Sequence, residues 1–136
     1  MDAVRALPDA YGDGYRSAAN LCHQLRSLDR LWSLLRLFEP RADDIVLLLR
    51  PDLLYRDRLD CLRDLKLLSD GRGDLIVPAW QPWGGLNDRF AFCSVRAAHI
   101  YATRGRLLTT SCQDMRAVHA EQFLRYASPA TGCGSG

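Results

Sequence analysis

Apolar residues recur every three or four positions between Arg16 and Leu35. This spacing predicts an amphipathic helix of about six turns, which ends at Pro40. The stripe consists of Leu21, Leu25, Leu28, Trp32 and Leu35. Because Asn20 and His23 lie off this stripe, we expect them to be partly exposed polar side chains rather than ligands.

Three short apolar runs predict strands. Residues 44–49 form a continuous run without alternation, which is typical of a strand covered on both faces, as in parallel sheets. Pro51 then prevents further pairing. Residues 75–77 and 89–93 predict two more short strands. In open α/β sheets ligands bind at the carboxyl ends of strands, so the segments after these runs are candidate site segments.

Capping residues and periodicity predict the remaining helices. Asp57 can cap a short helix that reaches Leu68, and Ser94 can cap a helix that carries Val95 and Tyr101 on one side. A polar turn near Ser111 precedes a last helix over residues 115–127. The order of elements predicts one α/β layered domain over residues 16–127. Residues 1–15 are predicted to be an irregular lead-in and residues 128–136 a flexible tail.

Composition narrows the class of protein. The chain of 136 residues is long enough for one domain with a single core. The formal charge of +2 comes without a basic block, and the arginines are evenly spaced, so no nucleic-acid partner is expected. Almost all cationic side chains are arginines; a GC-rich coding sequence explains this, and bidentate phosphate binding is the functional alternative. Because no apolar run is long enough to span a membrane and no signal peptide is visible, we expect a cytoplasmic protein.

The cysteines indicate neither a zinc site nor a disulfide framework. They are odd in number, five in all, and none forms a C-x-x-C pair. Free thiols in a reducing compartment are the expected state. The chain also lacks a Gly-x-Gly-x-x-Gly motif, a phosphate-binding loop and a nucleophile elbow, which excludes a Rossmann, a P-loop and an α/β-hydrolase interpretation.

Arg50 and Asp52 are the first candidate pair. Side chains two residues apart in an extended segment point the same way, so both would face one site. The simpler interpretation is a surface ion pair or a helix cap. The functional one is a carboxylate that binds a ribose hydroxyl or a divalent ion on a diphosphate.

The loop over residues 78–89 is the second candidate. It holds Trp80, Trp83 and the Gly84–Gly85 pair before Asn87, Asp88 and Arg89. Aromatic faces stack on sugar rings, and a carboxylate can bind sugar hydroxyls or act as a general base. A tight turn with the tryptophans as core anchors is the alternative.

His119 and Glu121 open the predicted last helix. An acidic residue there is favourable through the helix dipole alone, which is the simpler interpretation. His99 is expected to be a partly buried structural histidine in the middle of its helix.

Taken together, three segments resemble a group of glycosyltransferases that are similar to lipopolysaccharide and capsule sugar transferases. They are Arg-Pro-Asp-Leu-Leu-Tyr at 50–55, Gly-Gly-Leu-Asn-Asp-Arg-Phe-Ala at 84–91 and His-Ala-Glu-Gln-Phe-Leu at 119–124. The resemblance spans residues 17–127. It implies a partial GT-A-like layered sheet with flanking helices, a nucleotide-sugar donor and a glycan or other acceptor.

The resemblance also implies roles for single residues. Asp52 resembles the last carboxylate of the Asp-x-Asp element that holds Mn²⁺ or Mg²⁺, while Arg50 stands where the first carboxylate would be and could neutralise the diphosphate itself. Asp88 and Glu121 are the expected catalytic carboxylates. The expected substrate-binding residues are Arg50, Asp52, Trp83, Gly84, Gly85, Asn87, Arg89 and His119.

The chain departs from the GT-A pattern at both ends. The nucleotide-binding half that precedes the metal element in GT-A enzymes is mostly missing, so a truncated chain, with a partner chain supplying that half, is one expectation. An inactive fragment or a non-catalytic binding module derived from such an enzyme is the alternative function.

Overall fold

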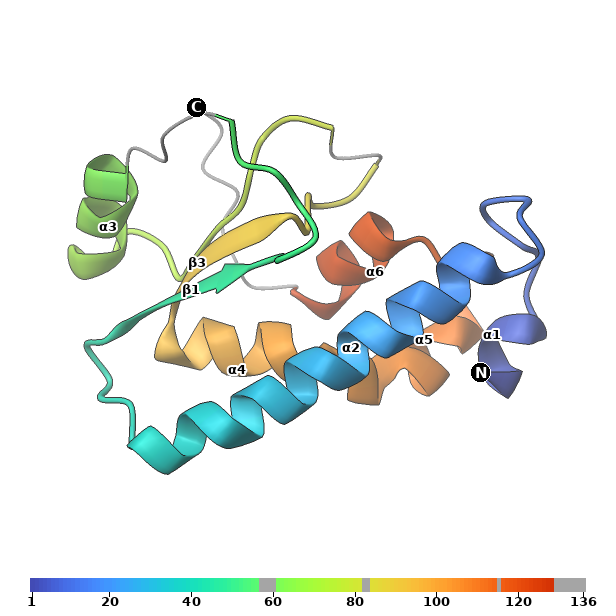
Figure 1. The fold of residues 1–136 in the computed structure, drawn as a ribbon, viewed down its shortest axis with the longest axis horizontal. Coiled ribbons are helices and arrows are strands. Elements are labelled where there is room, and N and C mark those ends of the chain that lie inside the picture. The colour runs from blue at the N-terminus through green and yellow to red at the C-terminus, as the bar shows by residue number, and fades with distance from the viewer. Residues whose placement is uncertain (57–60, 82–83, 115, 129–136) are drawn as a thin grey trace.

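The computed structural model describes residues 1–56, 61–81, 84–114 and 116–128. Within them a small sheet lies over a layer of helices (Figure 1). The elements in chain order are α1 (Asp2–Arg5), α2 (Arg16–Leu35), the 3₁₀ helix η1 (Arg36–Phe38), β1 (Ile45–Leu49), α3 (Cys61–Ser69), β2 (Leu75–Ile76), β3 (Phe90–Ser94), α4 (Val95–Thr103), the 3₁₀ helix η2 (Arg104–Leu107), α5 (Leu108–Asp114) and α6 (Ala120–Ala127).

The sheet is antiparallel, and the prediction of parallel strands was wrong. Its order is β1-β3-β2, and β3 pairs antiparallel with both neighbours. The α3 connection links β1 to β2, and these two strands do run the same way. However, β3 lies between them, and the described residues of the segment 77–89 that leads into it hold no crossover helix, which a parallel neighbour would require. The chain is therefore a mixed α/β protein with an antiparallel sheet.

β1 is covered on one face only, which corrects the prediction of burial on both faces. Leu48 is buried and Val46 packs on the core, whereas Leu47 and Leu49 keep 40% and 50% of their surface exposed. Burial alternates along β1 because successive side chains of a strand point to opposite faces, even where the sequence is uniformly apolar.

α2 and α4 run beneath the sheet and form most of the main core with it (Figure 1). The core is the buried cluster Trp32, Leu48, Ala91, Cys93, Ala97, Ala98, Tyr101, Ala102 and Leu124. The predicted cap of α4 is confirmed, since Oγ of Ser94 accepts a hydrogen bond from the Ala97 amide at 3.2 Å. His99 is exposed rather than partly buried, and its ring stacks on Trp32 at 5.1 Å.

A second buried cluster joins α1, α2, α5 and α6. It contains Val4, Ala18, Leu21, Leu25, Cys112, Val118 and Phe123. Residues 1–15, which were expected to be irregular, thus hold the one-turn helix α1, and Val4 belongs to the core. None of the described helices combines the length and the apolar character needed to cross a bilayer.

The C-terminal helices differ from the prediction. Ser111, which was expected in a turn, is fully buried within α5, and its hydroxyl donates to the Leu108 carbonyl at 2.9 Å. This local hydrogen bond satisfies the Ser111 hydroxyl, so the serine can be buried in a helix although serine is more typical of turns. The final helix begins at Ala120 instead of residue 115. The predicted Asp57 cap and residues 129–136 of the tail lie outside the described residues.

Three cysteines are free thiols, as expected: Cys22, Cys93 and Cys112. Burial raises the pKa of the Cys93 thiol to about 12. Cys93 therefore serves the core as a small apolar residue.

The Gly84–Gly85 pair seats its loop on the start of α6. A Cβ atom on Gly85 would lie 2.0 Å from the Glu121 carbonyl oxygen and 2.4 Å from the Gln122 nitrogen. The same approach lets the Leu86 amide donate to the Glu121 carbonyl at 2.9 Å. Gly84 has a φ of +78°, a backbone conformation that residues with a side chain rarely adopt. The pair therefore makes the close backbone approach that the sequence predicts, and the backbone that it approaches is that of α6.

The substitution Gly85→Ala should destabilise the fold. The added methyl group meets backbone atoms that cannot rotate away, so the loop and α6 must separate. We expect the free energy of unfolding to fall by about 3 kcal/mol in urea denaturation. Gly73→Ala is the matched control, because nothing lies within 4 Å of a Cβ at Gly73. Equal stabilities of the two variants would contradict the contact.

Candidate functional site

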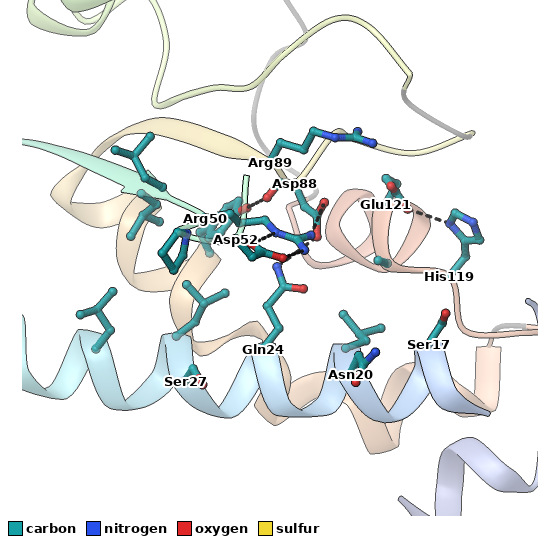
Figure 2. A pocket seen from close by; sticks show the side chains of 18 of the residues that line it. Ser17, Asn20, Gln24, Ser27, Arg50, Asp52, Asp88, Arg89, His119 and Glu121 are labelled. Carbon is teal, nitrogen blue, oxygen red and sulfur yellow. Dashed lines mark hydrogen bonds and ion pairs between the residues drawn. The ribbon is translucent and has the colours of Figure 1, made fainter. Parts of the chain in front are cut away.

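A cavity of about 960 Å³ lies between α2, the end of β1, the start of β3 and the start of α6. Side chains from all four segments point into it (Figure 2). Its polar lining consists of Tyr11, Ser17, Asn20, Gln24, Ser27, Arg50, Asp52, Asp88, Arg89, Tyr101, His119 and Glu121. This volume is within the range of small-molecule sites.

The strand register brings the two candidate carboxylates together. Leu49 pairs with Phe90, so β3 begins where β1 ends. Asp52 follows β1, Asp88 precedes β3, and both line the cavity. Their convergence on one hollow, expected from the sequence, is confirmed. The reason differs from the prediction: antiparallel pairing joins the end of one strand to the start of the other.

Arg50 lies between these carboxylates. Its Nε and Nη2 donate to the two oxygens of Asp52 at 3.1 and 2.7 Å, while Nη1 lies 3.8 Å from Oδ1 of Asp88. The hydrogen bonds from Arg50 hold the pKa of Asp52 below its ordinary value, and the same bonds raise the pKa of Arg50. The two partners differ in exposure, since Asp52 keeps 62% of its side-chain surface and Asp88 only 5%.

Tyr55 fastens the two strand ends to each other. Its hydroxyl accepts from the Arg50 amide at 3.2 Å and lies within donating distance of the Arg89 carbonyl at 3.0 Å. The tyrosine of the Arg-Pro-Asp-x-x-Tyr segment thus positions the backbone on both sides of the cavity mouth. This role of Tyr55 was not predicted from the sequence.

Asp88 is held by α2 and α4. Nε2 of Gln24 donates to its Oδ2 at 3.1 Å, and the Tyr101 hydroxyl donates to its backbone carbonyl at 3.3 Å. Gln24 was not predicted from the sequence to be a site residue. A signal was present: Ser17, Asn20, Gln24 and Ser27 recur at helical spacing and form a polar stripe beside the apolar one.

A buried arginine lies behind Asp88. Arg104 is only 1% exposed, and its guanidinium stacks on the Tyr101 ring at 4.1 Å. Its Nη1 donates to the Tyr101 carbonyl, whereas Nε and Nη2 have no hydrogen-bond partner among the residues that the structure describes. Burial lowers the pKa of Arg104, and the Tyr101 and Asp88 charges oppose this shift. Burial also raises the pKa of Tyr101 to about 12. Asp88 therefore interacts electrostatically with the buried Arg104 as well as with Arg50.

The remaining loop residues mostly shape the site. Asn87 is fully buried and outside the cavity lining: its amide donates to the Trp80 carbonyl at 2.6 Å, and its Oδ1 accepts from the Arg89 amide at 2.9 Å. The Arg89 guanidinium lies over the Trp80 ring at 4.9 Å. Gly84 and Gly85 contact α6 instead of the cavity. Trp83 lies outside the described residues.

His119 and Glu121 form a pair at one end of the cavity (Figure 2). Nδ1 of His119 lies 2.9 Å from Oε2 of Glu121, at an angle poorly suited to a hydrogen bond. The His119 ring stacks on Tyr11 at 4.8 Å, and the Tyr11 hydroxyl accepts from the Ala120 amide at 2.9 Å. Burial raises the pKa of Tyr11, and the Glu121 and Asp88 charges add to this. Tyr11 comes from the lead-in, to which sequence analysis assigned no site residue.

Possible metal ligands are few. Among the described residues, no three His, Cys, Asp or Glu side chains are grouped so that they could hold a metal ion. Asp52 can offer one carboxylate, which Arg50 already binds at both oxygens.

A search of protein-family models, of curated proteins and of solved structures gave no match.

Replacing Arg50 should destabilise the cavity wall. Arg50→Gln leaves the buried Asp88 without its guanidinium neighbour, so we expect the free energy of unfolding to fall by about 1–2 kcal/mol. This is less than the roughly 3–5 kcal/mol lost with one partner of a fully buried pair, because solvent screens Arg50. Urea denaturation at pH 7 measures this loss in the free energy of unfolding. The pKa of Asp52, followed by NMR, should rise toward its ordinary value.

Arg41→Gln is the matched control for this experiment. Arg41 binds Asp43 across the same spacing of two residues, but both side chains are about three quarters exposed, at 74% and 70%. We expect no measurable change in stability. A loss with Arg41→Gln as large as that with Arg50→Gln would contradict a special role for the cavity pair.

Proposed function

We propose that this chain is a glycosyltransferase-like domain that binds a nucleotide-sugar donor and transfers its sugar to a hydroxyl group of an acceptor. One observation carries the proposal: Arg50 faces Asp52 and Asp88 at a cavity that also holds Glu121 and His119. A guanidinium suits a diphosphate, and carboxylates suit sugar hydroxyls. A partial GT-A-like layering of sheet and helices belongs to the same proposal.

Arg50 would bind the donor diphosphate. Its present bond to Asp52 is exchangeable, because Asp52 is 62% exposed and exposed ion pairs contribute little stability. Phosphate oxygens offer the same bidentate geometry with more charge. As the bond between the anomeric carbon and the phosphate oxygen breaks, the leaving diphosphate keeps the electron pair, and Arg50 stabilises its charge.

Asp88 would bind a hydroxyl of the donor sugar. Gln24 and Arg50 already fix its carboxylate in place, which suits a positioning role better than proton transfer. Asn87 and the Gly84–Gly85 pair would contribute indirectly, by holding Asp88 and α6 in position.

Glu121 and His119 would activate the acceptor. Nδ1 of His119 lies 2.9 Å from the Glu121 carboxylate, whose negative charge favours the tautomer that keeps its proton on Nδ1 and leaves Nε2 free to accept one. That proton would come from the acceptor hydroxyl as its oxygen bonds to the anomeric carbon. Both side chains are mostly buried, with 22% and 11% of their surface exposed, and this limits competition from water.

A divalent cation has no dedicated site in this proposal. Asp52 alone fits a resident Mn²⁺ or Mg²⁺ poorly, so no step depends on the metal. Mg²⁺ often arrives bound to substrate phosphates with one or two protein carboxylates, and Asp52 is the residue proposed to contact such an ion.

A non-catalytic binding module is the second candidate. It is favoured by the engagement of Arg50 with two carboxylates, which gives these residues a structural role without any ligand. The two candidates differ in turnover: the module would bind sugars or nucleotides but release no nucleotide diphosphate.

Nucleotide sugars should raise the melting temperature of the chain. At 100 times Kd, binding adds about 2.7 kcal/mol to the free energy of unfolding, measurable by thermal denaturation with UDP- and GDP-sugars, with and without EDTA. Asp88→Asn should abolish the shift. Asp29→Asn is the control, since Asp29 binds Arg106 at the surface and does not line the cavity. No shift with any nucleotide sugar on folded wild-type protein would overturn the proposal.

Glu121→Gln should slow transfer without weakening donor binding. Loss of the residue that orients the base should lower kcat by about 100-fold to 10,000-fold, measured as release of nucleotide diphosphate. Glu39→Gln, a change at an exposed glutamate outside the cavity, should leave kcat unchanged. If Glu121→Gln kept full turnover, the pair would not be the base.

A further inference from the structure

The cavity changes in character along α2. The N-terminal half of the helix presents mainly polar residues, Ser17, Asn20 and Gln24 beside Leu21, whereas Leu28 and Leu31 follow Ser27 in the next two turns. About 10 Å of helix separates Gln24 from Leu31, at 1.5 Å per residue. One wall of the cavity therefore has a polar half and an apolar half.

The opposite wall has the same division. His119 and Glu121 face the polar half of α2, and Leu48, Leu49 and Pro51 complete the apolar half. In Figure 2 Ser17, Asn20, His119 and Glu121 lie toward one end of the cavity, and Gln24, Arg50, Asp52 and Asp88 meet near its middle. Arg50 and Asp52 flank Pro51 in the sequence and also line the cavity, so the apolar half adjoins the charged residues.

The apolar half opens onto an exposed strip. Leu31 and Leu49 remain 51% and 50% exposed at its mouth. Leu34 and Phe38 follow Leu31 at helical spacing along the end of α2 and η1 and continue the strip, since they are 57% and 82% exposed. Contiguous apolar residues on a surface indicate a binding function, in contrast to single exposed leucines. A chain that leaves the cavity on this side thus meets further apolar surface.

We infer that the acceptor is an amphiphile, with a hydroxyl-bearing head in the polar half and an alkyl chain along the leucines. The inference rests on the proposed function for the role of this molecule, but the binding itself does not require a donor. Glu121 and His119 match the head, because a carboxylate oxygen and a neutral imidazole nitrogen accept hydrogen bonds from hydroxyl groups. Burial of each methylene group against Leu28 and Leu31 strengthens binding by up to about fourfold.

A series of alkyl glucosides tests this inference without any nucleotide sugar. Methyl, butyl and octyl β-glucoside share one head and differ in chain length. We expect the affinity measured by isothermal titration calorimetry, below the micelle concentration, to rise at least tenfold from butyl to octyl, with one molecule bound per chain. Equal affinities along the series, or no binding of any member, would overturn the inference.

Leu31→Asn tests the position of the alkyl chain. Leu31 is half exposed, so the substitution should leave the fold intact while lowering the affinity for octyl glucoside at least fivefold. Leu107→Asn is the matched control, because Leu107 is 45% exposed and lies outside the cavity, and it should change nothing. Equal losses in both variants would indicate unspecific adsorption and overturn the inference.

Sedimentation of the free chain distinguishes a protein partner. A wild-type dimer that becomes a monomer with Leu31→Asn would mean that a second copy covers the strip, and it would overturn the inference. A monomer that binds octyl glucoside but shows no nucleotide-sugar shift would preserve the amphiphile site and overturn only the proposed function.

Discussion

The antiparallel pairing of β1 with β3 is the constraint on which the cavity depends. Its register sets Leu49 against Phe90, so the segment that leaves β1 and the segment that enters β3 must share one end of the sheet. The Tyr55 hydroxyl then joins the two backbones beyond the last pair. A slip of the register by one residue would reverse the faces of all these side chains and move Asp88 away from Arg50.

The loop before β3 shows how a motif can serve a site without touching it. Gly85 permits contact between two backbones, and Asn87 uses both ends of its side chain on neighbouring peptide groups. These contacts hold Asp88 and the first turn of α6 at fixed positions. Of the described residues in this segment, Asp88 and Arg89 line the cavity. Most of the segment therefore fixes the positions of Asp88 and α6, and the Asp88 carboxylate is the acidic group that it places in the cavity.

Charge is unevenly distributed around the cavity. The Asp88 side chain is almost fully buried; it lies 3.8 Å from the Arg50 guanidinium and interacts electrostatically with the buried Arg104. Asp52 and Glu121 are partnered by Arg50 and His119. Each carboxylate is thus held by a cationic or imidazole group, which keeps it in place in a partly desolvated site. A phosphate group that binds Arg50 must replace Asp52, and this exchange is favoured because Asp52 is 62% exposed.

The sequence by itself determined the local structure. The leucine spacing predicted α2, Ser94 predicted the cap of α4, and the glycine pair predicted a close backbone approach. Tertiary structure alone decided that the strands are antiparallel, because an apolar run specifies burial and not the direction of its neighbour. It also decided that Gln24 and Tyr11 join Asp88 and His119, since these contacts connect segments 64 and 108 residues apart in the chain. Periodicity reports which face of an element is covered, whereas packing decides what covers it.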